Sequence, residues 1–331
     1  MQPPPHVEVF SLCASMIKAR AVWAAAQLGI ADHVGTAPVS VDALADATKT
    51  HSDTLYRVLR LLAANGIFHE SEGRCFAHTP QSESLRSDHP TKTRAAVLLL
   101  GGIDFWNAFA RLDRSVETGE SGWRMTQGMG FFDWLPNHPE AAPIFNDAMV
   151  GIHGGEPPAV AEAYPFAGTV VDVGGGSGNM LVHILGRHAD ATGVLFDLPH
   201  VADAARANLL SAGLADRCTV RTGNFFEGVP EDGDVYVLSH IVHDWDEDSC
   251  VRILSHCAKA KKAGGKVLLV EMVVPGPNEP HPAKELDLVM LAVPGGRERT
   301  VDEYAELFGK AGLRLTRVVP TMSPDSVLEA E

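Results

Sequence analysis

Apolar residues follow two different periods along this chain, and the change comes after residue 163. Residues 7–32 and 93–163 carry apolar side chains at helical spacing and are predicted to be helical. From Thr169 onward, short apolar runs alternate with helical or turn segments, which is typical of a parallel sheet covered on both faces. We therefore expect three parts, bounded as residues 1–90, 91–163 and 164–331.

The strands of the last part are predicted from its apolar runs. Five runs are candidates for parallel strands: VVDVG, GVLFDL, CTVRTG, DVYVLS and KVLLVEMVV. Helical or turn segments separate them, including ARANLLSAG and DSCVRILSHCAKAKKAGG. Two runs near the end, LRLTRVVPT and SVLEAE, are predicted to pair as antiparallel strands that close the sheet.

A compact pattern between residues 40 and 78 predicts two short helices and a hairpin. Ser40 is a candidate cap for the helix VDALADAT, and Ser52 or Asp53 is a candidate cap for the next helix. Asn65-Gly66 ends that second helix, and IFHESEGRCFAH is typical of a hairpin. The second helix has an apolar stripe at positions i, i+3, i+4 and i+7, made by Leu55, Val58, Leu59 and Leu62. Two helices followed by a hairpin resemble a winged helix, which serves either DNA binding or dimerisation.

The charge of the chain argues against nucleic acid as the partner of this module. The net charge is −15, whereas nucleic-acid binding depends on Lys and Arg side chains at phosphates. Residues 1–100 are electrically balanced, and the predicted recognition helix offers only Arg57 and Arg60. We therefore expect a structural or dimerising module. The acidic remainder of the chain mildly favours a cationic small ligand.

The sequence shows no pattern for export or membrane insertion. It has no run of about 18 apolar residues, and MQPPPHVEVF lacks the basic and then apolar pattern of a signal peptide. The five cysteines include no CxxC pair and are expected to be reduced packing residues. We expect a cytoplasmic protein that makes no membrane contact.

The stretch VVDVGGGSGNM predicts a ligand-binding turn between a strand and a helix. Its glycines, Gly174, Gly176 and Gly178, form G-x-G-x-G, while Asn179 breaks the G-x-G-x-x-G fingerprint of dinucleotide sites. No lysine follows, so a phosphate-binding P-loop is excluded. A tight turn without a ligand would also use such glycines.

The next two strands indicate which ligand the turn takes. Asp197 ends the strand in GVLFDLPH, where an acid can hydrogen-bond a ribose diol. A third strand ends in GNFF (223–226), which offers an apolar face and a polar edge to adenine. The site thus suits a nucleoside without phosphates, and S-adenosylmethionine, which carries a positive sulfonium, fits that description.

The fourth strand carries candidate acid–base chemistry. VYVLSHIVHDW places His243 just after the strand, and Glu271 and Glu298 follow later in the chain. Methyl transfer to a phenol, with a pKa of about 10, needs a base at neutral pH, and histidine is suited to that task. A carboxylate on its other nitrogen would fix the tautomer. Packing under the sheet is the alternative for His243, and a metal pair from His240 and His243 lacks a convincing third ligand, so we expect no metal.

In chain order, VDVGGGSG, FDLPHV, HDWDEDSCVRIL, GKVLLVE, DLVMLA and GGRERT resemble the plant caffeate- and flavonoid-type O-methyltransferases and their bacterial relatives. The resemblance covers nearly the whole chain. It implies an α/β fold: a Rossmann-like, seven-stranded class I methyltransferase sheet with an N-terminal helical and winged-helix dimerisation domain. It also implies a homodimer, S-adenosylmethionine as methyl donor without a metal, and an aromatic small-molecule acceptor, with residues 91–163 capping the substrate.

The same resemblance assigns roles to individual residues. His243 would be the general base, flanked by Glu271 and Glu298. The methyl donor would contact Gly174, Gly176, Asp197, Leu198, Asn224, Phe225, Ser239 and His240. Substrate contacts would come from Phe105, Trp106, Met149, His153, Asp244, Asp287 and Met290, each of which has an equally good interpretation as a core residue.

Two departures from the family pattern are visible. Asn224 stands where many relatives have aspartate, and its oxygen can still accept a hydrogen bond from an adenine amino group. Ser239 stands where plant members have lysine, which favours the bacterial branch.

Three alternatives to O-methylation remain open at the level of sequence. Some bacterial members of this architecture decarboxylate or hydroxylate polycyclic substrates instead. Methyl transfer to nitrogen would need no base. A DNA-binding regulator that senses a ligand is the third alternative, and the charge of the chain opposes it.

Overall fold

A computed structural model describes residues 3–331, and the chain divides into two compact units. The first unit comprises the chain up to Phe109 together with Phe132–Gly154. The second comprises Ala110–Phe131 and Gly155–Glu331. The sheet of the α/β fold lies in the second unit, and the winged helix lies in the first.

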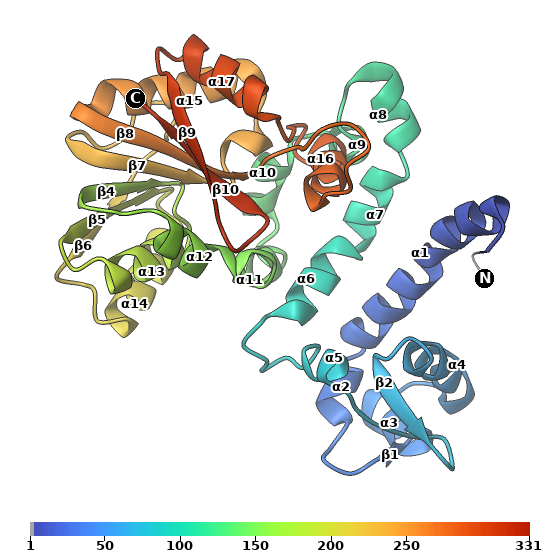
Figure 1. Ribbon diagram of the computed structural model, residues 1–331. Coiled ribbons are helices and arrows are strands. Elements are labelled where there is room, and N and C mark those ends of the chain that lie inside the picture. The colour runs from blue at the N-terminus through green and yellow to red at the C-terminus, as the bar shows by residue number, and fades with distance from the viewer. Residues whose placement is uncertain (1–2) are drawn as a thin grey trace. The chain divides into compact units, whose positions relative to one another are not determined.

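The first unit begins with the expected helices and hairpin (Figure 1). The sheet has the order β1-β3-β2, so a short strand that the sequence pattern missed joins the hairpin. Leu55, Leu59 and Leu62 are buried, as the apolar stripe predicted, while Val58 is partly buried beside them. The elements are α1 (Pro5–Gln27), α2 (Ile30–His33), β1 (Val39–Ser40), α3 (Val41–Thr48), α4 (Ser52–Ala63), β2 (Phe68–Ser71) and β3 (Cys75–His78).

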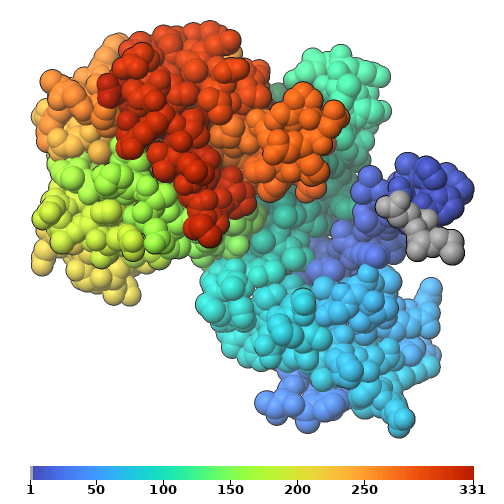
Figure 2. Space-filling model, in the orientation of Figure 1, coloured from blue at the N-terminus to red at the C-terminus, as the bar shows by residue number. Residues whose placement is uncertain are grey.

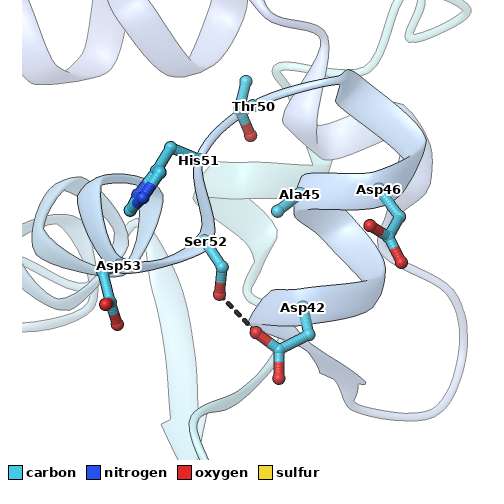
Figure 3. Close-up of a pocket in the computed structure, with 7 residues that line it drawn as sticks. All are labelled: Asp42, Ala45, Asp46, Thr50, His51, Ser52 and Asp53. Atoms are coloured by element: carbon cyan, nitrogen blue, oxygen red, sulfur yellow. Dashed lines mark hydrogen bonds between the residues drawn. The ribbon is translucent and has the colours of Figure 1, made fainter.

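The corner between α3 and α4 confirms one predicted cap and corrects the other. The Ser40 hydroxyl accepts the backbone N–H of Ala43 at 3.2 Å and caps α3. Neither Ser52 nor Asp53 caps α4, because its N-cap residue is His51, which makes no side-chain cap bond. The Ser52 hydroxyl donates instead to Asp42 (Figure 3).

Aspartates gather at this corner. Asp42, Asp46 and Asp53 line a shallow surface hollow of about 420 Å³ together with Ala45, Thr50, His51 and Ser52 (Figure 3). Asp53 also pairs with Arg74 at 2.9 Å, which neutralises one of the few basic groups of the module. A negatively charged corner repels phosphates, in keeping with the expectation that this winged helix does not bind nucleic acid.

Helix α1 leaves apolar side chains exposed. Phe10 and Leu12 are 72% and 76% exposed, and Val9, Met16 and Ile17 are exposed as well. By length and composition alone, α1 is also the one helix among residues 3–331 that could cross a membrane, which the sequence pattern did not suggest. An exposed apolar face is typical of a surface that another protein chain covers.

The chain between the hairpin and the large sheet is helical, as predicted for residues 93–163. The helices are α5 (Pro80–Glu83), α6 (Thr93–Leu100), α7 (Ile103–Phe109), α8 (Leu112–Thr118), α9 (Gly122–Gln127), α10 (Phe131–Trp134), the 3₁₀ helix η1 (Leu135–Asn137), α11 (Ala142–His153) and α12 (Glu156–Ala163).

The second unit is built on a seven-stranded sheet with the order β6-β5-β4-β7-β8-β10-β9. Strands β4 to β8 run parallel, and β10 is antiparallel to both β8 and β9, which confirms the predicted closing pair. The strands are β4 (Gly168–Val173), β5 (Ala191–Asp197), β6 (Cys218–Thr222), β7 (Gly233–Ser239), β8 (Lys261–Met272), β9 (Leu315–Pro320) and β10 (Asp325–Ala330).

Helices cover both faces of this sheet, which confirms the α/β fold class (Figure 1). Helices α12, α13 (Asn179–Arg187) and α14 (Ala202–Ser211) bury apolar side chains such as Leu181 and Leu209 on one face. Helices α15 (Glu247–Ala260) and α17 (Val301–Lys310) bury Ile253 and Phe308 on the other. The C-terminal segment, red in Figure 2, forms part of the outer surface of this unit.

One boundary differs from the sequence expectation. The pattern extended the helical or turn segment through residue 265, but α15 ends at Ala260 and β8 begins at Lys261. The register against β7 then shifts by several residues, and Gly264 takes a left-handed φ of 78°. Strand pairing absorbs the extra residues as an irregularity that the local pattern does not reveal.

Candidate active site

A glycine turn joins β4 to α13 at the carboxyl edge of the sheet. Gly174, Gly176 and Gly178 have left-handed φ values of 74°, 55° and 80°. A Cβ on Gly174 would lie 2.5 Å from Cδ1 of Ile241. Glycine is required here for both reasons, which accounts for the spacing seen in the sequence.

Asp197 at the end of β5 is bound to this turn. Its carboxylate accepts the backbone N–H of Gly176 at 2.8 Å and that of Leu198 at 2.6 Å. Burial raises the pKa of Asp197, while these two hydrogen bonds act in the opposite direction. The structure therefore brings together Gly176, Asp197 and Leu198, which the sequence assigned to one ligand, and the Leu198 side chain is exposed.

Asn224 and Phe225 follow β6 at the same edge. The Asn224 side-chain oxygen accepts the backbone N–H of Phe226 at 3.0 Å, which shapes the turn after the strand. The Phe225 ring lies 3.7 Å from the position of a Cβ on Gly174, and its centroid is 6.1 Å from that of Trp245. Asn224 thus already holds its own turn, whereas Phe225 lies beside the glycines.

A buried acid that sequence analysis did not assign lies under the turn. Asp172 in β4 is 1% exposed, and its Oδ2 would lie 2.6 Å from a Cβ on Gly175. That oxygen has no hydrogen-bond partner among residues 3–331. Burial, and after it the charges of Asp197 and Glu156, raise the pKa of Asp172 to about 7. The turn therefore covers a buried acid whose Oδ2 is left without a partner by the described residues.

His243 lies at the end of β7, in the 3₁₀ helix η2 (Val242–Asp244), and is 5% exposed. Its Nδ1 is 2.7 Å from Oε1 of Glu298 and 3.4 Å from Oε2 of Glu271. Glu271 lies on β8, and its Oε1 accepts the backbone N–H of Val242 at 3.1 Å. The three residues predicted to act together are therefore in contact.

This geometry determines which ring nitrogen of His243 carries the hydrogen. A carboxylate at Nδ1 keeps a hydrogen there and leaves Nε2 as the proton acceptor. The nearest acid to Nε2 is Asp244, whose Oδ1 lies 3.7 Å away, beyond hydrogen-bond distance. The geometry thus leaves Nε2 as the nitrogen that can accept a proton.

Charges around the ring set its protonation state. Burial, and then the positive charges of His240 and Arg299, hold the pKa of His243 well below its usual range. Burial raises the pKa of Glu298 to about 7 against the partial opposition of the same two cations, and it raises the pKa of Glu271 well above its usual range. The His243 ring is therefore neutral at neutral pH.

Three further buried charged residues were missed by the sequence analysis. Glu156, at the start of α12, accepts the Ser239 hydroxyl through one oxygen and contacts Nε2 of His240 at 2.8 Å through the other. Asp325 lies 3.4 Å from the same nitrogen. Arg299 is 1% exposed and donates to the carbonyl of Val242 at 3.0 Å. Only Arg299, beside Glu298 in GGRERT, had a signal in the sequence.

The predicted substrate residues divide between the two units. In the second unit, Asp287 on α16 (Pro282–Ala292) accepts the backbone N–H of Glu298 at 2.9 Å, and Met290 is buried on the same helix. Burial raises the pKa of Asp244 well above its usual range. The structure thus places Asp287 beside Glu298 and Asp244 beside His243, while for Met290 it shows burial only.

In the first unit, the other four substrate candidates lie on α7 and α11. Phe105 is buried, which suits a core residue, and the Trp106 ring centroid lies 5.1 Å from the Arg20 guanidinium. Met149 and His153 lie on α11. Their role at a substrate remains a prediction.

A third possible metal ligand is present beside the histidine pair. Atoms of His240, His243 and Glu271 lie within 4.8 Å of one another, so the spacing alone would admit an ion. However, Nδ1 of His243 and Nε2 of His240 already face Glu298 and Glu156 at 2.7 Å and 2.8 Å. An ion would have to compete with these two contacts.

A glycine turn, an acid on the next strand and a histidine–carboxylate pair along one sheet edge define a nucleoside-dependent group-transfer enzyme. Two family models identify which one. The O-methyltransferase domain matches residues 109–314, and the O-methyltransferase dimerisation domain matches residues 10–88. The chain belongs to the O-methyltransferase family.

Known relatives match over nearly the full length. The phenazine O-methyltransferase PhzM of Lysobacter antibioticus is 43% identical over 313 residues, covering 94% of this chain and 92% of that protein. The crystal structure of LaPhzM superposes with a TM-score of 0.95 at 41% identity and covers 99% of both chains.

Two further matches bear on cofactor and chemistry. NcsB1, an O-methyltransferase of neocarzinostatin biosynthesis, has been solved with S-adenosylmethionine and 2-hydroxy-5-methyl naphthoic acid. It matches with a TM-score of 0.82 at 35% identity, covering 94% of this chain and 95% of that one. The aclacinomycin 10-hydroxylase RdmB of Streptomyces purpurascens is 34% identical over 308 residues, covering 91% and 82%, so relatives with another chemistry also share this architecture.

Proposed function

We propose that this chain transfers the methyl group of S-adenosylmethionine to a phenolic hydroxyl of an aromatic natural product, with His243 as general base. The observation that carries the proposal is the buried contact between His243 Nδ1 and Glu298 at 2.7 Å, beside the glycine turn. It leaves Nε2 to accept a proton. Family membership and relatives that act on aromatic hydroxyls support the same reaction.

The residues at the sheet edge fit the methyl donor. The glycine turn admits close approach of a ligand to the backbone, and Asp197 offers carboxylate oxygens to a ribose diol. The buried oxygen of Asp172 suits a cationic group. We assign Gly174, Gly176, Asp197, Leu198, Asn224, Phe225 and Ser239 to donor binding. When bound, S-adenosylmethionine supplies an electrophilic methyl group on a sulfonium.

His243 performs the proton transfer. A phenol with a pKa of about 10 is protonated at neutral pH, so its oxygen is a poor nucleophile. As that oxygen gains the methyl group, its proton passes to Nε2 of His243. Glu298 at Nδ1 stabilises the imidazolium that forms, a general-base contribution of roughly 10²–10⁴-fold.

The remaining assignments complete the proposal. Residues 1–90 dimerise, 91–163 link the domains and cap the substrate, and 164–331 bind the methyl donor. The exposed apolar face of α1 and the matched dimerisation domain support a homodimer. We also propose the cytoplasm as the compartment, in keeping with five free cysteines.

Hydroxylation is the second candidate function, because a hydroxylase shares the architecture. The intact set of His243, Glu271 and Glu298 favours methyl transfer, since hydroxyl activation is the task that needs this base. Transfer to nitrogen would leave the same set without a purpose.

The test uses S-adenosylmethionine with a labelled methyl group and a panel of hydroxylated polyketides, flavonoids, catechols and phenazines. Mass spectrometry follows the label in the wild type, in His243→Ala and in the matched control His69→Ala, whose side chain is exposed in the first unit. We expect label on an aromatic oxygen in the wild type and the control, and loss of it in His243→Ala. Products that gain a hydroxyl or lose a carboxylate would contradict the proposal.

A further inference from the structure

We propose that His240 is a positioning residue: Glu156 and Asp325 stabilise it as an imidazolium, and its positive charge keeps the neighbouring base His243 neutral. The inference rests on the proposed role of His243. It makes His240 a positioning residue that acts through the base, and it gives functions to two acids, Glu156 and Asp325, that the sequence did not single out.

The backbone at His240 has a left-handed conformation that brings its side chain into the buried site. Its φ is 51°, in the left-handed region that few residues other than glycine adopt. The strand thereby turns directly after Ser239 and places the imidazole where only 9% of the side chain is exposed. Strained backbone of this kind persists where surrounding contacts hold it.

Carboxylates from three elements face the His240 ring. Nε2 lies 2.8 Å from Glu156 on α12 and 3.4 Å from Asp325 on β10, and Nδ1 lies 3.8 Å from Glu271 on β8. Two carboxylates thus lie at Nε2, whereas Glu271 is beyond hydrogen-bond distance of Nδ1. Opposite charges this close favour the protonated, positively charged ring. Burial alone would lower the pKa of His240, but Glu156, the hydrogen bonds to Asp325 and Glu156, and Glu271 together raise it well above the usual range.

The cation so formed lies beside the base. The ring centroids of His240 and His243 are 5.1 Å apart. Groups facing His243 from the packed elements are Glu271 on β8, Glu298 after α16, Asp244 on η2 and the buried guanidinium of Arg299. Protonating His243 in the resting enzyme would put a second positive ring next to His240, so repulsion keeps the base ready to accept a proton.

This assignment differs from a cofactor contact for His240, which the family resemblance implied. Because the ring lies among Glu156, Asp325 and Glu271, we infer that it influences the protonation of His243 and does not bind the methyl donor. Removing it should change the protonation of His243 and leave the affinity for the methyl donor unchanged. The two roles are therefore separable by experiment.

The experiment compares three variants. His240→Asn removes the charge with a residue that tolerates left-handed backbone. Glu156→Gln removes the anion that holds the imidazolium and keeps the shape. His240→Lys restores a cation, and Lys49 and Lys92 already adopt left-handed φ values of 55° and 52° in this chain. His69→Asn in the first unit is the matched control.

The readout is the protonation of His243, followed by NMR of the full-length protein labelled at histidine ¹³Cε1 and assigned with His243→Asn. The pH dependence of turnover on the acceptor found in the labelled-methyl panel is the second readout. For charges about 5 Å apart, we expect the His243 titration to move up by roughly one to two pH units in His240→Asn and Glu156→Gln. The acid limb of turnover should move up as well, because the positive charge of His240 lowers the pKa of Glu298. His240→Lys and the control should titrate like the wild type.

An unchanged His243 titration in both His240→Asn and Glu156→Gln would overturn the inference. So would a loss of S-adenosylhomocysteine affinity in His240→Asn with no shift in titration, because that result assigns the ring to the cofactor. If His240→Asn does not fold, Glu156→Gln alone decides. Full turnover in His243→Ala would instead remove the proposed base, so the two failures are distinguishable.

Discussion

The edge of the sheet proposed to bind the methyl donor and the surroundings of the proposed base are built in different ways. At β4 to β6, the site is formed mainly by a glycine turn and its backbone, and two backbone N–H groups donate to Asp197. At β7 and β8, side-chain charges from distant segments surround one imidazole, with Glu298 lying 55 residues beyond His243. The first region determines the shape of the ligand-binding turn, and the second determines the protonation of His243.

The two regions should therefore differ in the substitutions that they tolerate. The proposed donor site, made largely by backbone groups, should fail when the backbone is strained or when Asp197 is removed. The proposed base, which is surrounded by several charged groups, should fail when the charge balance changes, even if every contact distance is kept. Substitutions in the two regions should therefore affect different measured quantities.

The largest effect is expected for Glu298→Gln. It keeps the shape of the side chain but removes the charge that stabilises the imidazolium of His243 and fixes its tautomer. Turnover should fall roughly 10²–10⁴-fold, with donor affinity unchanged. Single-turnover kinetics and calorimetry measure the two quantities. Glu306→Gln on the exposed side of α17 is the control, and a fall in donor affinity would break the separation of the regions.

Asp197→Ala should do the reverse. Loss of a charged hydrogen-bond acceptor for the ribose costs about 1.5–3 kcal/mol, or roughly tenfold to a hundredfold in donor affinity. Turnover at saturating donor should stay near the wild-type value. Asp203→Ala, an exposed acid on α14, is the matched control. Unchanged affinity would refute the ribose assignment.

The pH dependence should also separate the regions. Glu298 must be ionised to support the base, and burial raises its pKa to about 7. Turnover should therefore fall about tenfold for each pH unit below that value. Donor affinity measured over the same range should vary less, and an acid limb that persists in Glu298→Gln would assign the titration to another group.

Unfolding linked to Glu298 does not explain such an acid limb. Its pKa is raised on folding from a usual 4.5, so the folded state binds more protons between about pH 4.5 and 7. The contribution of this group to stability is therefore greatest at low pH and decreases as the pH rises through that window. Thermal unfolding at pH 6 and pH 8 checks the direction.

The smallest effect is expected for Gly174→Ala. A left-handed alanine costs about 1–2 kcal/mol, and the new Cβ would press on Ile241. We expect a lower melting temperature and weaker donor binding. Gly186→Ala on α13 meets no neighbour within 4 Å and should not lower stability. Equal melting temperatures for the two variants would show that the turn tolerates a side chain.

The two regions also differ in how far the sequence predicted them. The glycine turn and Asp197 are recognisable because a left-handed turn and a strand end leave local signals. Glu156 leaves none, because its partners Ser239 and His240 lie 83 and 84 residues away and its burial depends on how α12 packs on the sheet. His243 and Glu298 were candidates from their residue types and positions, and the family resemblance assigned the same roles. Their contact through Nδ1 emerged only with the fold.

The same distinction explains the smaller errors. Ser40 was correctly identified as a cap from its position before an apolar helix. The Ser52 hydroxyl does not cap α4 because it donates to Asp42, which comes close only after α3 and α4 pack. The end of α15 was misplaced because the pairing of β8 with β7 overrides the helical tendency of the segment after Ala260.

The most direct test of the central claim, that His243 is the base and lies apart from donor binding, is made on His243→Ala. Calorimetry with S-adenosylhomocysteine and single-turnover methyl transfer would be measured on one preparation. The account predicts unchanged affinity and methyl transfer slowed by roughly 10²–10⁴-fold. Loss of affinity together with turnover would show that His243 supports the structure of the site, and unchanged turnover would show that another group removes the proton.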